Sequence, residues 1–220
     1  CKRDVAVDDG VYKVDRRFGG PEYETLGALG SGLEVGNLKA IAAANQLCSQ
    51  YGLDSISAGV TIQFAVECYE RGLLTKDDTG GLELRFGDEA MMLRLLKMIA
   101  YREGFGDLLA EGSKRLSERI GRGSADFAMH VKGQEVPLHE PRGKFNVGLG
   151  YAVSETGADH LRAAHDTSFA TAESASLKSA WPLGVYKPVD PLAAGPDKVH
   201  LYARAELTSI LWNCVGGCFF

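Results

Sequence analysis

The sequence lacks any apolar run close to the ~18 residues that a bilayer-spanning helix needs. It also lacks a signal peptide, because Lys2, Arg3 and Asp4 lead into a mixed segment without an apolar core. It has no long basic run, and its formal net charge of −5 argues against nucleic acid or an anionic membrane as a partner. These absences predict a cytoplasmic protein with no nucleic-acid partner and no membrane partner.

Cysteine is scarce as well, since the 220 residues include only five. Their odd number and scattered spacing do not fit a secreted disulfide framework, so a reducing compartment is expected. Three of them stand at the ends of the chain, as Cys1, Cys214 and Cys218. Thiolates suit iron–sulfur clusters and zinc, so a single site could join the two ends. The initiator methionine is also missing, which suggests a piece of a longer protein.

The residues that are present follow a mainly helical pattern. Apolar residues make up 45% and charged residues 24%, which is ordinary for a globular protein. Apolar positions at helical spacing predict helices. The capping candidates are Asn37, Asp88 and Asp107, and any of Asp54, Ser55 and Ser57 could cap the second helix. The predicted helices span residues 37–51, about 54–72, 88–102, 107–120 and 197–212. Cys48 and Cys68 fall on apolar helix faces and are expected to be buried, inert thiols.

Two other features set the expected organisation. Weak alternation in residues 1–20 around Asp8–Gly10 predicts a short N-terminal β-hairpin. Glycines between residues 121 and 124 indicate a boundary between helical subdomains, and residues 166–196 look like a long irregular excursion. The predicted fold is therefore mainly α, with an N-terminal hairpin and two helical subdomains at residues 1–128 and 129–220.

The second half is rich in glycine, which lets backbone approach a ligand closely. Arg142 and Arg162 could each hold a phosphate or a carboxylate in a bidentate manner. The five histidines show no metal-binding spacing, and Asp159-His160 with His165 is at most a weak metal pair. In the first half, Glu22 and Glu24 flank a tyrosine after Gly20-Pro21. Both acids could simply favour the first turn of a helix, or one of them could face a pocket.

Five sequence blocks, in order, resemble the second and third domains of the tungsten-dependent aldehyde ferredoxin oxidoreductases. Cys1–Arg3 is similar to the end of their C-x-x-C-x-x-x-C motif, Gly20–Thr25 to G-P-E-Y-E-T, and Tyr51–Ser57 to Y-G-L-D-T-I-S. Lys132–Pro137 with Glu140–Gly143 resembles K-G-x-E-x-P and D-P-R-G, and Tyr151–Leu161 resembles Y-A-T-S-x-x-G-A-x-H-L. The resemblance covers nearly the whole chain.

The resemblance implies two cofactors. Cys1 and Cys218 would be the third and fourth ligands of a [4Fe–4S] cluster, with Cys214 a bystander; a zinc site of Cys214 and Cys218 is the alternative. The family's D-x-x-G-L-D and D-x-x-G-L-C blocks contact a tungsten (or molybdenum) bis-pterin. The implied pterin contacts here are Ser49, Gly52, Leu53, Asp54, Asn213 and, from a basic position of the family, Arg162. Ser49 and Asn213 replace family aspartates and Gly217 replaces a leucine, which removes charge near the pterin.

The resemblance also implies Glu24 and His160 as the acid–base pair, with Glu22 as the second choice to Glu24. The implied reaction is oxidation of an aldehyde to a carboxylic acid, with electrons passing through the cluster. The implied partners are ferredoxin or another electron carrier, a small aldehyde and an N-terminal pterin-binding domain of the same enzyme; a homodimer is a possible assembly. The alternatives are a tungsten reaction on another substrate, such as an aromatic acyl thioester, a non-enzymatic zinc-binding module, and a cofactor-free helical interaction domain.

Overall fold

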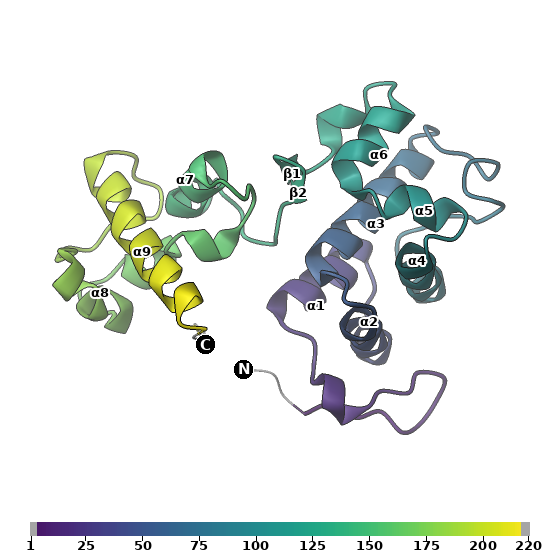
Figure 1. Cartoon of the computed structure of the whole chain (residues 1–220), viewed down its shortest axis with the longest axis horizontal. Helices are drawn as coiled ribbons and strands as arrows, with labels where there is room; N and C mark the ends of the chain where they lie inside the picture. The colour runs from purple at the N-terminus through teal and green to yellow at the C-terminus, as the bar shows by residue number, and fades with distance from the viewer. Residues whose placement is uncertain (1–3, 217–220) are drawn as a thin grey trace. The chain divides into compact units, whose positions relative to one another are not determined.

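The computed structural model describes residues 4–216 and is mainly α-helical, as the sequence predicts (Figure 1). The chain divides into two compact units, Cys1–Leu138 and His139–Phe220. The sequence places a subdomain boundary near residue 128 instead, and that division stays a prediction. Among the described residues, no helix combines the length and the apolar character that crossing a membrane requires.

The first unit is a set of helices followed by a small hairpin. It contains η1 (Arg16–Phe18), α1 (Tyr23–Leu29), η2 (Ser31–Leu33), α2 (Leu38–Tyr51), α3 (Ser55–Glu70), α4 (Glu89–Tyr101), α5 (Phe105–Leu109), α6 (Gly112–Ile120), η3 (Ser124–Phe127), β1 (His130–Val131) and β2 (Gln134–Glu135). The second unit contains α7 (Phe145–Val153), η4 (His160–Arg162), η5 (Asp166–Phe169), α8 (Ala175–Ser179), η6 (Trp181–Leu183) and α9 (Pro196–Cys214). Its short elements between α7 and α9 match the irregular excursion expected there.

Local signals set most helix ends in the first unit. The side chains of Asn37, Asp54 and Asp88 accept backbone hydrogen bonds at the starts of α2, α3 and α4. This confirms Asn37 and Asp88 as caps and selects Asp54 from the three candidates at the start of α3. The prediction of one continuous helix over residues 107–120 is wrong, because the structure has two helices there, α5 and α6. Gly112 has a φ of +82°, which a continuous right-handed helix does not allow. Asp107 lies inside α5 and pairs with Arg102 instead of capping a helix.

The expected N-terminal turn-back is present with minimal strand pairing, and a second hairpin follows later in the chain. The N-terminal segment folds back with a single antiparallel bridge, Val7 to Val14. The two-stranded sheet lies at β1 and β2, with His130 opposite Glu135. Its turn residues Lys132 and Gly133 have φ values of +56° and +94°, which suit a type I′ hairpin turn.

Helix α3 is the centre of the first unit and packs against α1, α4, α5, α6 and β2 (Figure 1). It is buried on several sides, because apolar residues occupy most of its length and not one stripe. Leu29, Ile62 and Leu95, from α1, α3 and α4, are completely buried in this core. Helix α1 is therefore anchored at its C-terminal end in a large core.

Gly59 in α3 lies against the backbone of α1. A Cβ atom at this position would lie 2.6 Å from the carbonyl oxygen of Ala28 and 2.8 Å from its Cβ atom. Backbone yields less readily than a flexible side chain. We therefore expect Gly59→Ala to lower the free energy of unfolding of the first unit by about 1–3 kcal/mol, although alanine is the better helix former. Denaturant unfolding followed by far-UV circular dichroism measures this.

Gly36→Ala is the matched control, because a Cβ atom on Gly36 would meet nothing within 4 Å. We expect its stability to stay within about 0.5 kcal/mol of the parent. Equal stabilities of the two variants would contradict the close α1–α3 packing.

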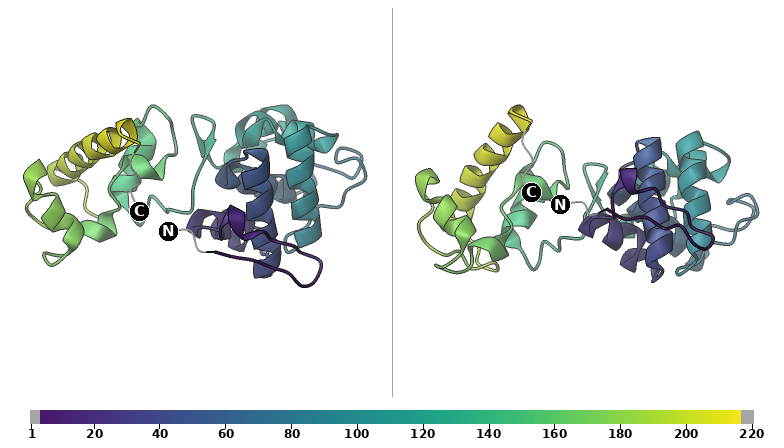
Figure 2. Two further views of the ribbon diagram at one scale, coloured as in Figure 1. Left: turned by 60° about the horizontal axis from the view of Figure 1, so that its bottom comes forward. Right: turned by 90° about the horizontal axis from the view of Figure 1, so that it is seen from below.

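The second unit has a smaller core, formed by Leu177, Ala180, Val185, Val189 and Leu201. Helix α9, drawn in yellow in Figure 2, packs against α7 in this unit. A buried ion pair supplements the core: Lys198 of α9 binds Asp166 of η5, and both side chains are almost fully buried. Both carboxylate oxygens of Asp166 also accept a hydrogen bond from the backbone N–H of Asn146, at 3.1 and 2.9 Å. This network joins α7, η5 and α9.

Candidate active site

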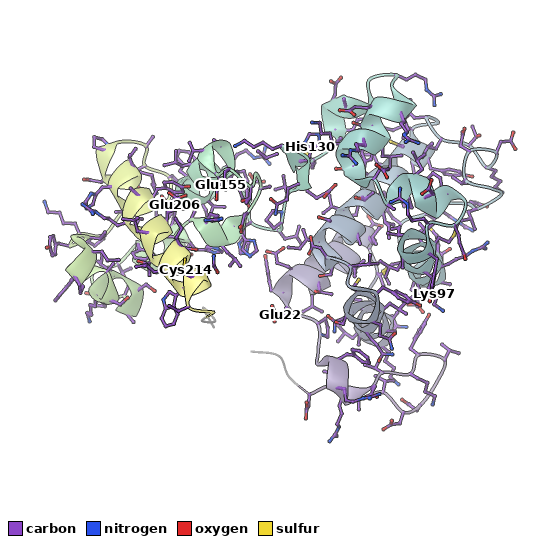
Figure 3. The ribbon with its side chains drawn as sticks, viewed as in Figure 1. Glu22, Lys97, His130, Glu155, Glu206 and Cys214 are labelled. Carbon is purple, nitrogen blue, oxygen red and sulfur yellow. The ribbon has the colours of Figure 1, made fainter. Side chains whose placement is uncertain are left out.

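Glu24 lies in the first turn of α1 and is tied to Leu138, the last residue of the first unit. Its Oε2 accepts a hydrogen bond from the Leu138 amide N–H at 2.8 Å. The Tyr23 hydroxyl donates to the Leu138 carbonyl oxygen at 3.0 Å. Glu22 is exposed and makes no capping hydrogen bond (Figure 3). Of the two acids that the sequence left open, Glu24 is the one that the fold orients through the Leu138 amide.

The start of α1 also meets the start of α3. The hydroxyls of Thr25 and Ser55 lie 2.8 Å apart, and Thr25 is buried. Thr25 follows Glu24 in the sequence, and Ser55 follows Asp54. The fold thus brings together two segments that are 30 residues apart, the one with Glu24 and the one with Asp54.

A groove of ≈ 490 Å³ lies beside α1 in the first unit. Its lining is mostly apolar and includes Tyr23, Leu26, Leu38, Ile41 and Leu138. The Leu138 side chain lies directly over Gly27, where a Cβ atom would come within 1.6 Å of Leu138 Cδ1. Leu138 therefore links the groove to Glu24, since its amide binds the carboxylate and its side chain lines the groove.

His160, the other residue of the predicted acid–base pair, lies in a cluster of three imidazoles in the second unit. Its ring stacks on that of His139, with centroids 4.7 Å apart and an interplanar angle of 25°. His165 stands edge-on to His139 at a centroid distance of 4.3 Å. Burial, assisted by the charges of His139, Lys144 and His160, lowers the pKa of His165 to about 4. His165 is therefore neutral at pH 7.

The implied pterin contacts form two groups, one in each unit. In the first unit, Ser49, Gly52 and Asp54 are exposed where α2 ends and α3 begins, and Leu53 is half-buried. Gly52 has a φ of +66°, and nothing lies within 4 Å of where its Cβ would be. The Asp54 carboxylate is engaged, because it accepts the amides of Ile56 and Ser57 at 3.3 and 3.1 Å.

In the second unit, the Arg162 guanidinium pairs with Glu155 at 2.7 Å (Figure 3 labels Glu155). Asn213 is exposed in the last turn of α9. One turn earlier, the Ser209 hydroxyl donates to the carbonyl oxygen of Leu161 at 2.9 Å, which anchors α9 beside Arg162. Arg162 and Asn213 are therefore held on neighbouring elements of one unit.

The cysteines separate into buried and exposed thiols. Cys48 and Cys68 are buried, as predicted, and burial raises the pKa of these thiols to about 12 and about 11. Cys214 is exposed at the end of α9 (Figure 3). The two predicted cluster ligands, Cys1 and Cys218, lie outside the described residues, as does Gly217. In the part that the structure describes, no cysteine belongs to a group of three or more potential metal ligands.

Comparison with known proteins decides the family. The family model described as "Aldehyde ferredoxin oxidoreductase, domains 2 & 3" matches residues 1–220. The chain belongs to this family. A tungsten-containing aldehyde ferredoxin oxidoreductase of Pyrococcus abyssi is 37% identical over 204 residues, which are 91% of this chain and 31% of that protein. The chain thus spans about a third of the length of this relative.

Two further proteins that resemble this chain are not named aldehyde ferredoxin oxidoreductases. An aliphatic sulfonate oxidoreductase, WOR-like subunit, of Pyrococcus furiosus is 39% identical over 150 residues, or 66% of this chain and 24% of that protein. A solved structure, the active site complex BamBC of benzoyl coenzyme A reductase in complex with 1,5-dienoyl-CoA, matches with a TM-score of 0.54 and 28% identity. It covers 64% of this chain and 21% of that one. Membership of an oxidoreductase family argues against the zinc-module and cofactor-free interpretations.

Sequence reasoning missed Leu138, which binds Glu24 in the first unit, and His139 and Lys144, which lie by His160 in the second unit. Leu138 and His139 lie between two blocks of the resemblance and match neither, so nothing marked them. Lys144 had no visible partner in the sequence, yet its Nζ lies 3.0 Å from His139 Nδ1. Only the folded chain reveals these contacts.

Proposed function

We propose that this chain is part of an enzyme that oxidises an aldehyde to a carboxylic acid at a tungsten (or molybdenum) bis-pterin. The observation that carries the proposal is the family match over residues 1–220. The Pyrococcus abyssi relative, which is named as a tungsten-containing enzyme, supports the choice of metal. The reaction converts an aldehyde and water to a carboxylic acid, two electrons and two protons. When bound, the metal pterin would accept the two electrons. The residues of this chain must then bind the substrate and move the protons.

Glu24 is the proposed acceptor of the proton from the attacking water. The Leu138 amide donates a hydrogen bond to its Oε2, which fixes the orientation of the carboxylate. A positioned carboxylate or imidazole of this kind contributes about 10²–10⁴-fold to a rate. His160 is the proposed second acceptor, because a neutral imidazole ring nitrogen can take a proton near pH 7.

Two of the residues proposed to hold the pterin, Ser49 and Asn213, have uncharged polar side chains. The Ser49 hydroxyl and the Asn213 amide can donate and accept hydrogen bonds. Gly52 leaves its backbone open to a flat ligand, since no atom lies within 4 Å of a Cβ there. Asp54 would support the pterin contact indirectly, by fixing the start of α3 that it caps. The Arg162 guanidinium would bind both the pterin and Glu155. We propose all of these, together with Leu53, as pterin contacts.

The remaining parts of the proposal come from the family alone. Cys1 and Cys218 would bind a [4Fe–4S] cluster, which would pass electrons one at a time to ferredoxin. An N-terminal pterin-binding domain of the same enzyme would complete the site, and a homodimer and a cytoplasmic location are part of the same proposal.

The apolar groove supports an aldehyde with an apolar body as the substrate. A volume of ≈ 490 Å³ falls within the range of about 300–1,000 Å³ that is usual for small-ligand sites. Leu138 places the groove next to Glu24. A small apolar group in the groove would therefore lie close to the proposed proton acceptor.

We expect Leu38→Asp in the intact enzyme to lower kcat/KM for an aromatic or long aliphatic aldehyde by about 10-fold. Leu38 lines the groove and is 68% exposed, so a carboxylate there would face the substrate. Leu38 is also the first residue of α2, where an acidic side chain is favourable, so stability should not fall. Steady-state kinetics with a series of aldehydes measures the effect.

Val11→Asp is the control, because Val11 is exposed and does not line the groove. Its kcat/KM values should match those of the parent for every aldehyde. An equal loss on short polar and long apolar aldehydes in Leu38→Asp would argue against substrate binding in the groove.

A second candidate is a tungsten reaction on another substrate, since relatives include a sulfonate oxidoreductase and a benzoyl coenzyme A reductase complex. Anaerobic assays of the intact enzyme with aldehydes, an aliphatic sulfonate and benzoyl-CoA separate the candidates. Aldehyde-dependent reduction of an electron acceptor supports the proposal. Turnover of only a sulfonate or only the thioester would replace it with the second candidate.

A further inference from the structure

The three-histidine cluster of the second unit, His139, His160 and His165, is held by contacts that dictate where its protons lie. The Lys144 Nζ lies 3.0 Å from His139 Nδ1. An ammonium group can only donate, so Nδ1 must accept, and the single proton of a neutral His139 is on Nε2. The His165 Nε2 lies 3.2 Å from the carbonyl oxygen of His160. A carbonyl can only accept, so the proton of neutral His165 is also on Nε2.

Helix α7 and the residue that precedes it fix the position of His139 by two contacts. Lys144 directly precedes α7 and binds the ring, while Tyr151 within α7 donates its hydroxyl to the His139 carbonyl oxygen at 3.1 Å. Tyr151 is buried, so α7 provides a rigid support. The fixed ring of His139 then stacks on His160 at a centroid distance of 4.7 Å.

The other charged groups of the segments around the cluster are paired with one another. Arg162 of η4 binds Glu155 and lies near Asp159. Asp166 of η5 binds Lys198 of α9. Glu140 binds Arg142. Lys144 differs from these cations, because its ammonium group contacts an imidazole nitrogen of the cluster. A positive charge at this distance disfavours protonation of nearby imidazoles.

We propose that Lys144 is a positioning residue for proton transfer: it fixes His139 as the Nε2–H tautomer, and the fixed ring holds His160 in place. This inference rests on the proposed role of His160 as a proton acceptor. Lys144 acts through His139 and does not itself touch the reacting atoms. The charge of Lys144 is also one of the causes that, after burial, lower the pKa of the neighbouring His165 to about 4.

The first test needs no activity. Long-range ¹H–¹⁵N NMR of the 220-residue chain reports which nitrogen of each histidine carries the proton. We expect His139 to be the Nε2–H tautomer in the parent and in Lys144→Arg. In Lys144→Glu a carboxylate can accept from Nδ1–H, so the tautomer should change to Nδ1–H while the other histidine signals remain. An Nδ1–H tautomer in the parent, or no change in Lys144→Glu, would overturn the inference.

The second test uses the intact enzyme and its pH–rate profile. Removing a positive charge makes protonation of the imidazoles easier. Lys144→Met should therefore move the acid limb of kcat to higher pH by about one unit, with activity retained above the limb. Lys144→Arg should keep the parent profile, and so should the exposed control Lys187→Met. A uniform loss of kcat at all pH values in Lys144→Met would show a merely structural role and overturn the proposal.

One further variant keeps the two proposals apart. If His160→Gln has the full activity of the parent, the proposed role of His160 fails, and the catalytic part of this inference fails with it. If His160→Gln is impaired but the pH profile of Lys144→Met is unchanged, the proposed function stands and only the role of Lys144 is overturned.

Discussion

Glu24→Gln in the intact enzyme is expected to lower kcat for aldehyde oxidation by about 10²–10⁴-fold. Glutamine keeps the size of the side chain, and its carbonyl oxygen can still accept the Leu138 amide hydrogen bond that holds Glu24 Oε2 at 2.8 Å. It cannot take a proton from the attacking water. Fold and orientation are therefore retained while proton transfer is removed. Steady-state kinetics at saturating aldehyde measures the change, and KM should change little.

Glu22→Gln is the matched control for this variant. Glu22 lies two residues away, carries the same functional group and is exposed without a capping hydrogen bond. Its kcat should stay within a factor of two or so of the parent, because an exposed carboxylate has no fixed direction. A large loss in Glu22→Gln with little loss in Glu24→Gln would reverse the assignment of the two acids.

Lys198→Met is expected to destabilise the second unit by about 3–5 kcal/mol. Lys198 is 4% exposed and binds the completely buried Asp166. Its loss leaves a carboxylate without its counter-ion in the interior, where charge is poorly solvated. Urea unfolding of the 220-residue chain, followed by tryptophan fluorescence, isolates this effect. Both tryptophans, Trp181 and Trp212, belong to the second unit, so the fluorescence reports on that unit alone.

Arg142→Met removes an exposed ion pair from the same unit and serves as the control. Arg142 binds Glu140, but both side chains are mostly in solvent, where such pairs contribute little. Its unfolding midpoint should equal that of the parent. If Lys198→Met unfolds at the same urea concentration as Arg142→Met, the Asp166–Lys198 pair does not hold the second unit together.

Local structure was predictable where the signal lies within a few residues. Asn37 and Asp54 cap helices because their side chains reach amides two or three positions away, and Gly52 ends α2 in a left-handed conformation. The break between α5 and α6 was not predictable, since the apolar pattern continues across it while Gly112 leaves the helical backbone region. Periodicity reports which face is buried and says little about a single backbone dihedral angle.

The candidate site was predictable only through the family resemblance. The contact between Glu24 and Leu138 joins residues 114 positions apart, and no local pattern encodes such a distance. His139 and His160 come together through irregular segments and short 3₁₀ turns, so their spacing in the sequence matches no helical or strand period. The resemblance identified Glu24 and His160, and the fold then supplied their neighbours Leu138, His139 and Lys144.

Metal analysis of the intact, anaerobically purified protein tests the central claim most directly. Plasma mass spectrometry would quantify tungsten, molybdenum, iron and zinc per chain. The account predicts about one tungsten or molybdenum and about four irons, as a metal pterin and one [4Fe–4S] cluster require. Iron without tungsten or molybdenum would contradict the metal pterin, and zinc alone or no metal would contradict the proposed function as a whole.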